Sequence, residues 1–490
     1  MIATRSLRLA ATRFKEALID SSHRRRPVSS ALNFLDSGLR RNDNSGINQL
    51  PLNAHRRAAD RPPAARAPIA APLAPLVTLA AIALPALLLL PAWYLKHPLL
   101  YALRHLETPL LIGIPALALL RGRRFLPALS RAVLLAVVLL TIWREVDYRL
   151  QREAVLAAGP AMRAVGQHFI VGYSDFDEIR RLTASGLIGG IYLGRRNLRG
   201  RSFEQVAGEI AELQAIRRRA ELPPLIVAAD QEGGAVSHLS PLLEALPPLS
   251  TLADSQDPAA AARAYGQRQG RQLAALGVNL NFGPVVDLRP AKGGEDRLSN
   301  IAARAIASEP GRVVEIASAY LDGLNDHGVR GTLKHFPGLG RVRGDTHLRP
   351  ARLAASPAEL AGDWQPFRQL ASHPGAAIML GHVTLTALDP ERAASHSPAI
   401  IDGLLRERWG YDGLLVTDDL NMGAVVNLGI GRVAGEALAA GADLVLVSYD
   451  PRQVVRAIFG AAQALERREI APATLAESER RIAGFHTTIP

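Results

Sequence analysis

Two adjacent carboxylates follow an apolar stretch late in the chain. The run Gly413–Thr417 leads directly into Asp418 and Asp419. Buried carboxylates are costly unless they are paired or hydrogen-bonded, so a purely structural role for both acids is disfavoured. Side chains alternate along a strand, and we therefore expect only one of the two to face a site. We predict that one aspartate is a nucleophile and that hydrogen bonds hold the other.

A stretch rich in proline and glycine carries a cation and two imidazoles. Lys334 and His335 end an apolar run, and Asp345 and His347 follow within the next loop. A carboxylate two residues from a histidine can orient the ring and raise its basicity, which suits a general acid or base. An unrelated polar loop would look similar. A metal site built on His335 and His347 is disfavoured, because no third ligand stands at a local metal-site spacing.

A third acidic motif, Asp-Gln-Glu-Gly-Gly at residues 230–234, also ends an apolar run. The Asp230 carboxylate can accept two hydrogen bonds from a sugar diol, and the glycines let backbone approach a ligand. A strand end followed by a plain turn is the alternative.

An aspartate nucleophile, a separate proton donor and sugar-binding groups are together the parts of a retaining glycosidase. The donor here is an imidazole backed by Asp345, whereas most such enzymes use a second carboxylic acid.

Eight short, β-rich apolar runs follow residue 150. The runs are His168–Tyr173, Gly189–Leu193, Leu225–Asp230, Val278–Leu288, Gly331–Pro337, Ala376–His382, Gly413–Asp419 and Ala442–Ser448. Helical stretches stand between several of them, at Phe203–Ala220, Asp257–Leu276, Pro310–His327 and Pro398–Trp409. Apolar strands that alternate with helices predict a parallel sheet covered on both faces.

Eight such units predict an α/β fold of the TIM-type (β/α)8 barrel class over residues 151–490. In that fold the loops after the strands build the active site, and Asp230, Lys334, His335 and Asp418 all stand at run ends. A doubly wound sheet is the alternative. It would normally have a glycine-rich phosphate turn after its first strand, and Tyr173–Phe176 has none.

Five motifs in this order resemble the β-N-acetylhexosaminidase branch of glycoside hydrolase family 3, the type that recycles peptidoglycan. They are Asp230–Gly234, Asn281–Leu288, Lys334–Gly338, Asp345–His347 and Thr417–Met422. The resemblance implies a single-domain barrel that releases non-reducing terminal N-acetylglucosamine from muropeptides or related glycans. It also implies that no metal and no organic cofactor takes part.

The same resemblance implies roles for individual residues. Asp418 matches the nucleophile, His347 the acid/base and Asp345 the aspartate that partners this histidine. The matches to sugar-binding positions are Asp230, Arg304, Lys334 and His335, and His238 stands where the family commonly has an arginine. Residues 305–307 and Leu339 also depart from the family pattern. We expect these departures to affect substrate affinity and aglycone preference rather than bond cleavage.

Two other functions stay open. A β-glucosidase of the same family is disfavoured, because many such enzymes have a second α/β domain and a different acid. A membrane-tethered, non-catalytic sugar-binding barrel is the other alternative, and its motivation is His238 together with the altered segment after Arg304.

The net charge of +12 comes entirely from the first part of the chain. Residues 1–150 hold 21 lysines and arginines against 8 aspartates and glutamates, whereas residues 151–490 hold 36 against 37. Positive excess often indicates a nucleic acid or an anionic membrane as partner. Because the barrel region is neutral, we expect no nucleic-acid partner.

The absence of cysteine excludes disulfides and thiolate sites.

The N-terminal part divides into a tail and a membrane region. We interpret residues 1–68 as a basic, disordered tail. The alternative is that the true start codon lies downstream and that this stretch is not translated. Residues 69–150 predict two or three transmembrane helices, with membrane contact through 69–143. Ile69–Leu95 has no charged residue and exceeds the roughly 20 residues that cross a bilayer.

The two further apolar runs are weaker. Thr108–Leu120 is short, and Phe125–Trp143 contains Arg131; buried core helices are the alternative. Three spans place the barrel on the periplasmic side of a bacterial inner membrane, because basic loops prefer the cytoplasm, whereas two spans leave it in the cytoplasm. We favour the periplasmic side and expect a monomer.

Overall fold

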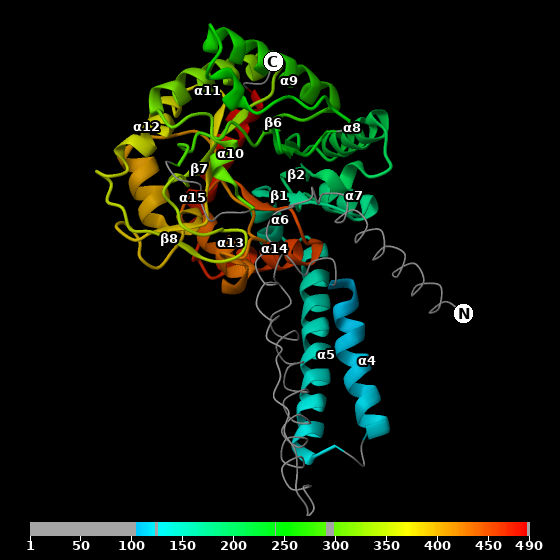
Figure 1. The fold of residues 1–490 in the computed structure, drawn as a ribbon. Helices are drawn as coiled ribbons and strands as arrows, with labels where there is room; N and C mark the ends of the chain where they lie inside the picture. The colour runs from blue at the N-terminus through cyan, green and yellow to red at the C-terminus, as the bar shows by residue number, and fades with distance from the viewer. Residues whose placement is uncertain (1–103, 123–125, 241, 291–297, 488–490) are drawn as a thin grey trace, which may run out of the picture. The chain divides into compact units, whose positions relative to one another are not determined.

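The computed structural model describes residues 104–122, 126–240, 242–290 and 298–487 (Figure 1). All of them belong to one compact unit, residues 70–490. The predicted tail, residues 1–68, and the uncharged run Ile69–Leu95 lie outside the described residues.

Each of the eight predicted runs contains one parallel strand. The strands are β1 (Phe169–Gly172), β2 (Gly190–Leu193), β3 (Ile226–Ala229), β6 (Leu280–Asn281), β7 (Gly331–Phe336), β9 (Ala376–Leu380), β11 (Leu415–Thr417) and β12 (Val445–Val447). A five-stranded sheet has the order β12-β1-β2-β3-β6, and a three-stranded sheet has the order β11-β9-β7. Four further strands form two small two-stranded sheets, β4 (Gln231–Gly233) with β5 (Val236–Ser237) and β8 (Ala351–Leu353) with β10 (Val383–Leu385). The α/β class is confirmed.

The ladder of hydrogen bonds is interrupted where these two sheets meet, so the sheets do not form one closed ladder and the (β/α)8 barrel stays a prediction. Isolated parallel bridges join Val285 to Lys334 at one junction and Val416 to Leu444 at the other. At the second junction backbone bonds remain, such as that from the N–H of Thr417 to the carbonyl oxygen of Leu444 over 2.9 Å, and side chains accept further backbone N–H groups. The N–H of Leu415 donates to Asp443 Oδ2 over 2.7 Å, and the N–H of Leu446 donates to Thr417 Oγ1 over 3.1 Å.

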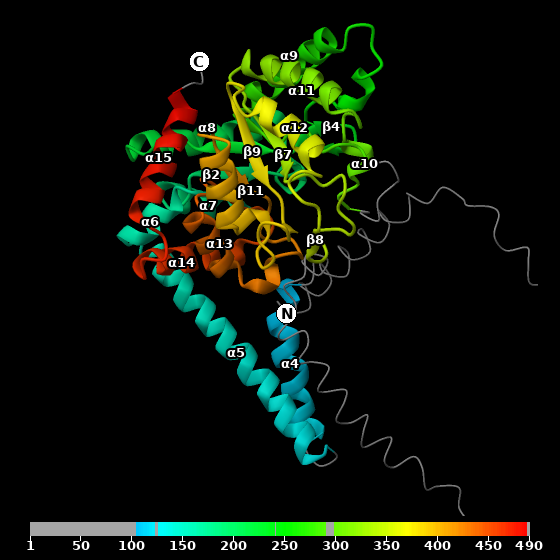
Figure 2. The same ribbon diagram turned by 90° about the vertical axis from the view of Figure 1, so that its left-hand side faces the viewer.

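Helices surround the strands (Figures 1 and 2). They are α6 (Pro160–Gly166), α7 (Phe176–Ala184), α8 (Phe203–Arg219), α9 (Pro258–Leu276), α10 (Ile301–Arg304), α11 (Pro310–Asn325), α12 (Ala361–Leu370), the π-helix η5 (Ala399–Arg408), α13 (Ile430–Ala439), α14 (Pro451–Glu466) and α15 (Pro472–Thr487). The four predicted helical stretches are confirmed. For α9 the local cause is visible, because Asp257 accepts a hydrogen bond from the N–H of Ala260 and Gly277 ends the helix at φ 94°.

The core forms two layers, because side chains alternate along the strands. On β3, Ile226 and Ala228 belong to a cluster that the strands enclose, whereas Val227 and Ala229 join the larger cluster beneath the helices. Both faces of the strands are therefore apolar, and polar side chains are left to the strand ends.

Two long helices precede the α/β region, α4 (Arg104–Gly122) and α5 (Ala128–Leu156). They contain the predicted spans Thr108–Leu120 and Phe125–Trp143. No helix in the described ranges is long and apolar enough to cross a membrane, so the structure does not support the predicted spans at these two runs. Charge explains the shortfall, since Arg131, Arg144 and Glu145 lie within α5. Arg452 of α14 fixes α5 to the barrel through Glu145, 2.6 Å away.

Candidate active site

The carboxyl ends of the strands surround a cavity of about 430 Å3. Seven of the eight predicted site residues line it: Asp230, His238, Arg304, Lys334, His335, His347 and Asp418. The eighth, Asp345, contacts His347 from behind. The fold thus brings together residues that stand far apart in the sequence, as expected for loops after parallel strands.

Asp418 and Asp419 lie in different environments. Both line the cavity, contrary to the expected alternation, because β11 ends at Thr417 and strand geometry stops there. The N–H of Asp419 donates to Asp418 Oδ1 over 2.8 Å. Burial raises the pKa of Asp418, but His335, His382 and His347 together hold it below its usual value. Asp418 is therefore a carboxylate at neutral pH.

Hydrogen bonds hold Asp419, as predicted for one acid of the pair. Its carboxylate accepts bonds from the N–H groups of Asn421 and Ser448, over 3.0 and 3.2 Å, and from both side chains. Burial nevertheless raises the pKa of Asp419 above its usual value. Asp419 thus fixes the loop that presents Asp418.

The imidazole of His347 is oriented from one side. Its Nδ1 lies 3.0 Å from Asp345 Oδ1 and 3.2 Å from Ser299 Oγ. Burial raises the pKa of Asp345, but N–H donors from Leu298 and His347 lower it overall, so the group is an acceptor. With Nδ1–H donated to Asp345, Nε2 is the nitrogen left for proton transfer in the cavity.

A buried network of four charges forms the opposite wall. Lys334 Nζ lies 2.6 Å from Asp230 Oδ1 and 2.6 Å from Glu232 Oε1. Arg304 binds both Glu232 oxygens, at 2.9 and 2.7 Å. Two cations balance two carboxylates, which is the condition for burying such groups. Burial lowers the pKa of Lys334, but the two acids raise it above its usual value.

Further hydrogen bonds orient the side chains of His335 and Asp230, two of the sugar-binding candidates. His335 Nδ1 lies 2.7 Å from Asp287 Oδ2, and its Nε2 lies 3.4 Å from Arg304 Nη2. Tyr192 donates its hydroxyl to Asp230 over 2.8 Å and lies 2.9 Å from His238 Nδ1. His238 therefore reaches Asp230 through a tyrosine rather than directly.

Several site residues were missed from the sequence. Glu232 stands inside a quoted motif, so motif position could have found it. Asp287 stands near the end of the run Val278–Leu288, where the sequence does predict a site residue. Tyr192 and Ser299 carried no such signal, because a tyrosine in a strand and a serine in a loop are ordinary. In the described part of the chain, no three His, Asp or Glu side chains are grouped to hold a metal.

A buried chain of polar groups supports the Asp418 loop from behind. His382 Nε2 lies 3.0 Å from the carbonyl oxygen of Asp419, and its Nδ1 lies 2.8 Å from Ser395 Oγ. Ser395 Oγ lies 3.1 Å from His396 Nδ1, on the short helix η4 (Ala394–His396). His382, at the end of its run, thus supports the loop that carries Asp418 and Asp419.

Comparison with known proteins decides the family. Residues 162–485 match the model of the glycosyl hydrolase family 3 N terminal domain. The chain belongs to glycoside hydrolase family 3. Membership confirms the resemblance in the five motifs and makes the protein a glycosidase.

Curated family 3 relatives are named β-hexosaminidases. One from Tolumonas auensis is 35% identical over 306 residues, which cover 61% of this chain and 85% of that protein. One from Alkalilimnicola ehrlichii is 37% identical over 285 residues, which cover 56% and 78%.

Solved family 3 structures agree. The β-N-acetylglucosaminidase from Paenibacillus sp. str. FPU-7 superposes with a TM-score of 0.63 at 32% identity, over 67% of this chain and 62% of that chain. The β-N-acetylhexosaminidase from Beutenbergia cavernae gives 0.61 at 28% identity, over 67% and 99%.

Proposed function

We propose that the protein is a retaining β-N-acetylhexosaminidase that releases terminal N-acetylglucosamine. The observation that carries the proposal is the Asp345-oriented imidazole of His347 lining one cavity with the ionised Asp418. The names of the relatives supply the sugar. Peptidoglycan fragments are the substrates we expect.

The reaction needs two displacements at the anomeric carbon. Asp418 attacks this carbon and forms a glycosyl ester while the glycosidic C–O bond breaks, and the His347 imidazolium gives its proton to the departing oxygen. Neutral His347 then takes a proton from water, whose oxygen attacks the same carbon and releases Asp418. Two inversions retain the β configuration.

The charged wall suits recognition of the sugar. Asp230 is the acceptor for ring hydroxyls, and Lys334, Arg304 and His335 are donors or acceptors at the cavity surface. The buried ion pairs fix these groups before the substrate arrives, which reduces the entropy cost of binding. His238 replaces the usual arginine and contacts Tyr192, so we expect weaker binding of the aglycone.

Hydrolysis of aryl glycosides by the full chain tests the proposal. We expect release of the aryl group from a β-N-acetylglucosaminide and little from the β-glucoside, with loss of turnover in Asp418→Asn. Preference for the glucoside would favour the β-glucosidase. Binding of N-acetylglucosamine without turnover by the wild type would favour the non-catalytic barrel.

We also propose that the enzyme is anchored in a bacterial inner membrane with its barrel in the periplasm, as a monomer. The support is the uncharged run Ile69–Leu95 behind a basic segment, since one span with basic residues in the cytoplasm leaves the barrel outside. A reporter fused after Pro490 should be active only when it works in the periplasm. Activity of a cytoplasm-specific reporter would refute this orientation.

A further inference from the structure

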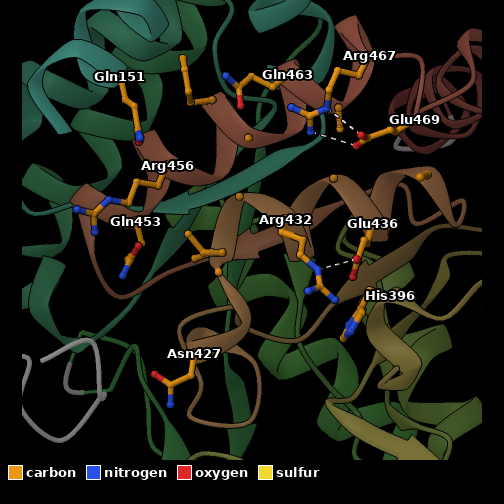
Figure 3. A pocket seen from close by; sticks show the side chains of 18 of the residues that line it. Gln151, His396, Asn427, Arg432, Glu436, Gln453, Arg456, Gln463, Arg467 and Glu469 are labelled. Carbon is orange, nitrogen blue, oxygen red and sulfur yellow. Dashed lines mark hydrogen bonds and ion pairs between the residues drawn. The ribbon is translucent and has the colours of Figure 1, made fainter. Parts of the chain in front are cut away.

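Arginines outside the catalytic cavity differ in whether a carboxylate compensates their charge. In a cavity of about 910 Å3 between α5, α13 and α14, Arg432 pairs with Glu436 and Arg467 pairs with Glu469, both over 2.8 Å (Figure 3). Arg330 differs, because its side chain makes no hydrogen bond or ion pair with any described residue, although only 8% of its surface is exposed. Burying such a cation is costly, since nothing replaces the water that it loses.

Arg330 lines a cavity of about 490 Å3 at the amino ends of three strands. Arg330 directly precedes β7, Ala376 begins β9, and Leu414 directly precedes β11. The catalytic cavity lies at the carboxyl ends of the strands, and the two cavities share no lining residue. The cavity at Arg330 is therefore separate from the catalytic one.

Two other lining residues place the guanidinium of Arg330 within this cavity. Its carbon lies 5.8 Å from the centre of the Phe485 ring, on α15. A Cβ at Gly375 would lie 2.6 Å from Arg330 Nη1, so glycine at this position leaves room for the guanidinium. Both Phe485 and Gly375 line the cavity. The face of a ring attracts a cation but carries no net charge, so Phe485 does not neutralise Arg330.

The carboxylates around this cavity hold other arginines. Arg480 and Arg481 also line it. Asp412 lies 2.5 Å from Arg480, and Asp443 lies 2.8 Å from Arg481. Burial lowers the pKa of Arg330 below its usual value, and no neighbouring acid opposes this effect. Among the described residues, Arg330 is thus the one lining arginine that has no carboxylate partner.

We propose that this cavity is a second ligand site, which binds a small organic acid through a carboxylate paired with Arg330. The fork of a guanidinium matches the two oxygens of a carboxylate. One unpaired arginine balances one negative charge, so a carboxylate fits better than a doubly charged phosphate. The cavity has the size of a small-molecule site. Its apolar lining residues, which suit an apolar body of the acid, are Pro374, Ala376, Ala377, Leu414 and Phe485.

Calorimetric titration of the full chain tests the site. The probes are benzoate, hexanoate, inorganic phosphate and benzamide, which has the shape of benzoate without its charge. We expect saturable binding of at least one of the two carboxylates, and binding of benzamide and phosphate that is weaker by at least about tenfold, because neither offers a singly charged carboxylate to the arginine. Benzamide that binds as tightly as benzoate, or a preference for phosphate, would overturn the proposal of a carboxylate site.

Three variants assign the binding to one side chain. Arg330→Gln should weaken binding of the carboxylate by at least about tenfold, because a hydrogen bond to a charged group is lost. Arg330→Lys keeps the charge without the fork, so its affinity should lie between those of the wild type and Arg330→Gln.

Arg480→Gln is the matched control, because it removes a positive charge from the same cavity. The Arg480 side chain is 60% exposed and paired with Asp412, so this variant should change the affinity by less than about threefold. A cooperative urea transition verifies that each variant is folded. Wild-type affinity in Arg330→Gln, an equal loss in Arg480→Gln, or no saturable binding of either carboxylate by the wild type would overturn the proposal.

Discussion

His347 Nδ1 lies 3.0 Å from Asp345 Oδ1, two residues earlier in the same loop. This contact leaves only Nε2 to exchange protons in the cavity, which gives His347 the geometry of an acid and base. We predict that His347→Ala lowers kcat about 10²- to 10⁴-fold for substrates with poor leaving groups. For a dinitrophenyl glycoside the first displacement needs no acid, so the glycosyl-enzyme should accumulate, and added azide should speed turnover. Equal loss for both leaving groups would argue against acid catalysis by His347.

A substitution of Tyr192 tests its contact with His238, the residue that stands where the family commonly has an arginine. Its hydroxyl donates to Asp230 and lies beside His238, so Tyr192→Phe removes a hydrogen bond to a charged sugar-binding group. Loss of such a bond costs about 1.5–3 kcal/mol, and we expect kcat/KM to fall at least about tenfold, mainly through KM. Tyr173→Phe is the matched control, because its hydroxyl contacts Glu209 and it does not line the cavity. A change confined to kcat would place Tyr192 in the chemistry instead.

The charged wall predicts a stability effect. Lys334→Met leaves the buried acids Asp230 and Glu232 with one cation, and breaking a buried pair in this way costs about 3–5 kcal/mol of unfolding free energy. The double variant Lys334→Met with Asp230→Asn should recover much of this loss, because Arg304 still balances Glu232. Arg268→Met, which breaks an exposed pair, should cost less than about 1 kcal/mol. Urea unfolding measures all three, and a double variant no better than the single one would contradict the charge account.

The acid limb of the pH profile depends on Asp418. Because its pKa lies below the usual value near 4, the carboxylate stays ionised down to that pH, and kcat/KM should fall only below about pH 4. His335 is the largest charge that lowers this pKa, so His335→Gln should raise the pKa and move the acid limb to higher pH. Initial rates between pH 3 and 7 measure the shift. An acid limb unmoved by the substitution would show that His335 does not act on Asp418.

Sequence patterns located most of the strands and of the site, because both depend on local chemistry. Each apolar run gave a strand, and polar residues at run ends converged on one cavity. What the patterns could not show were contacts between distant segments, such as the pairing of Glu232 with Arg304 or the support of Asp419 by His382. The side-chain contacts between β11 and β12 were equally hidden, where Asp443 and Thr417 accept hydrogen bonds from backbone N–H groups.

The helices α4 and α5 show a second limit of the sequence patterns. Apolarity alone predicted spans at Thr108–Leu120 and Phe125–Trp143, but the charges of α5 interact with its neighbours. Glu145 pairs with Arg452 of α14, and Arg144 pairs with Glu107 of α4 over 3.5 Å. A count of apolar residues does not reveal such partners.

The identity of the nucleophile is the central claim. Incubation of the full chain with a 5-fluoro-N-acetylglucosaminyl fluoride, followed by proteolysis and mass spectrometry of the peptides, tests it most directly. We predict one added sugar, located on Asp418, and no label in Asp418→Asn. A label on Asp419 or any other residue, or turnover without a trapped intermediate, would contradict the account.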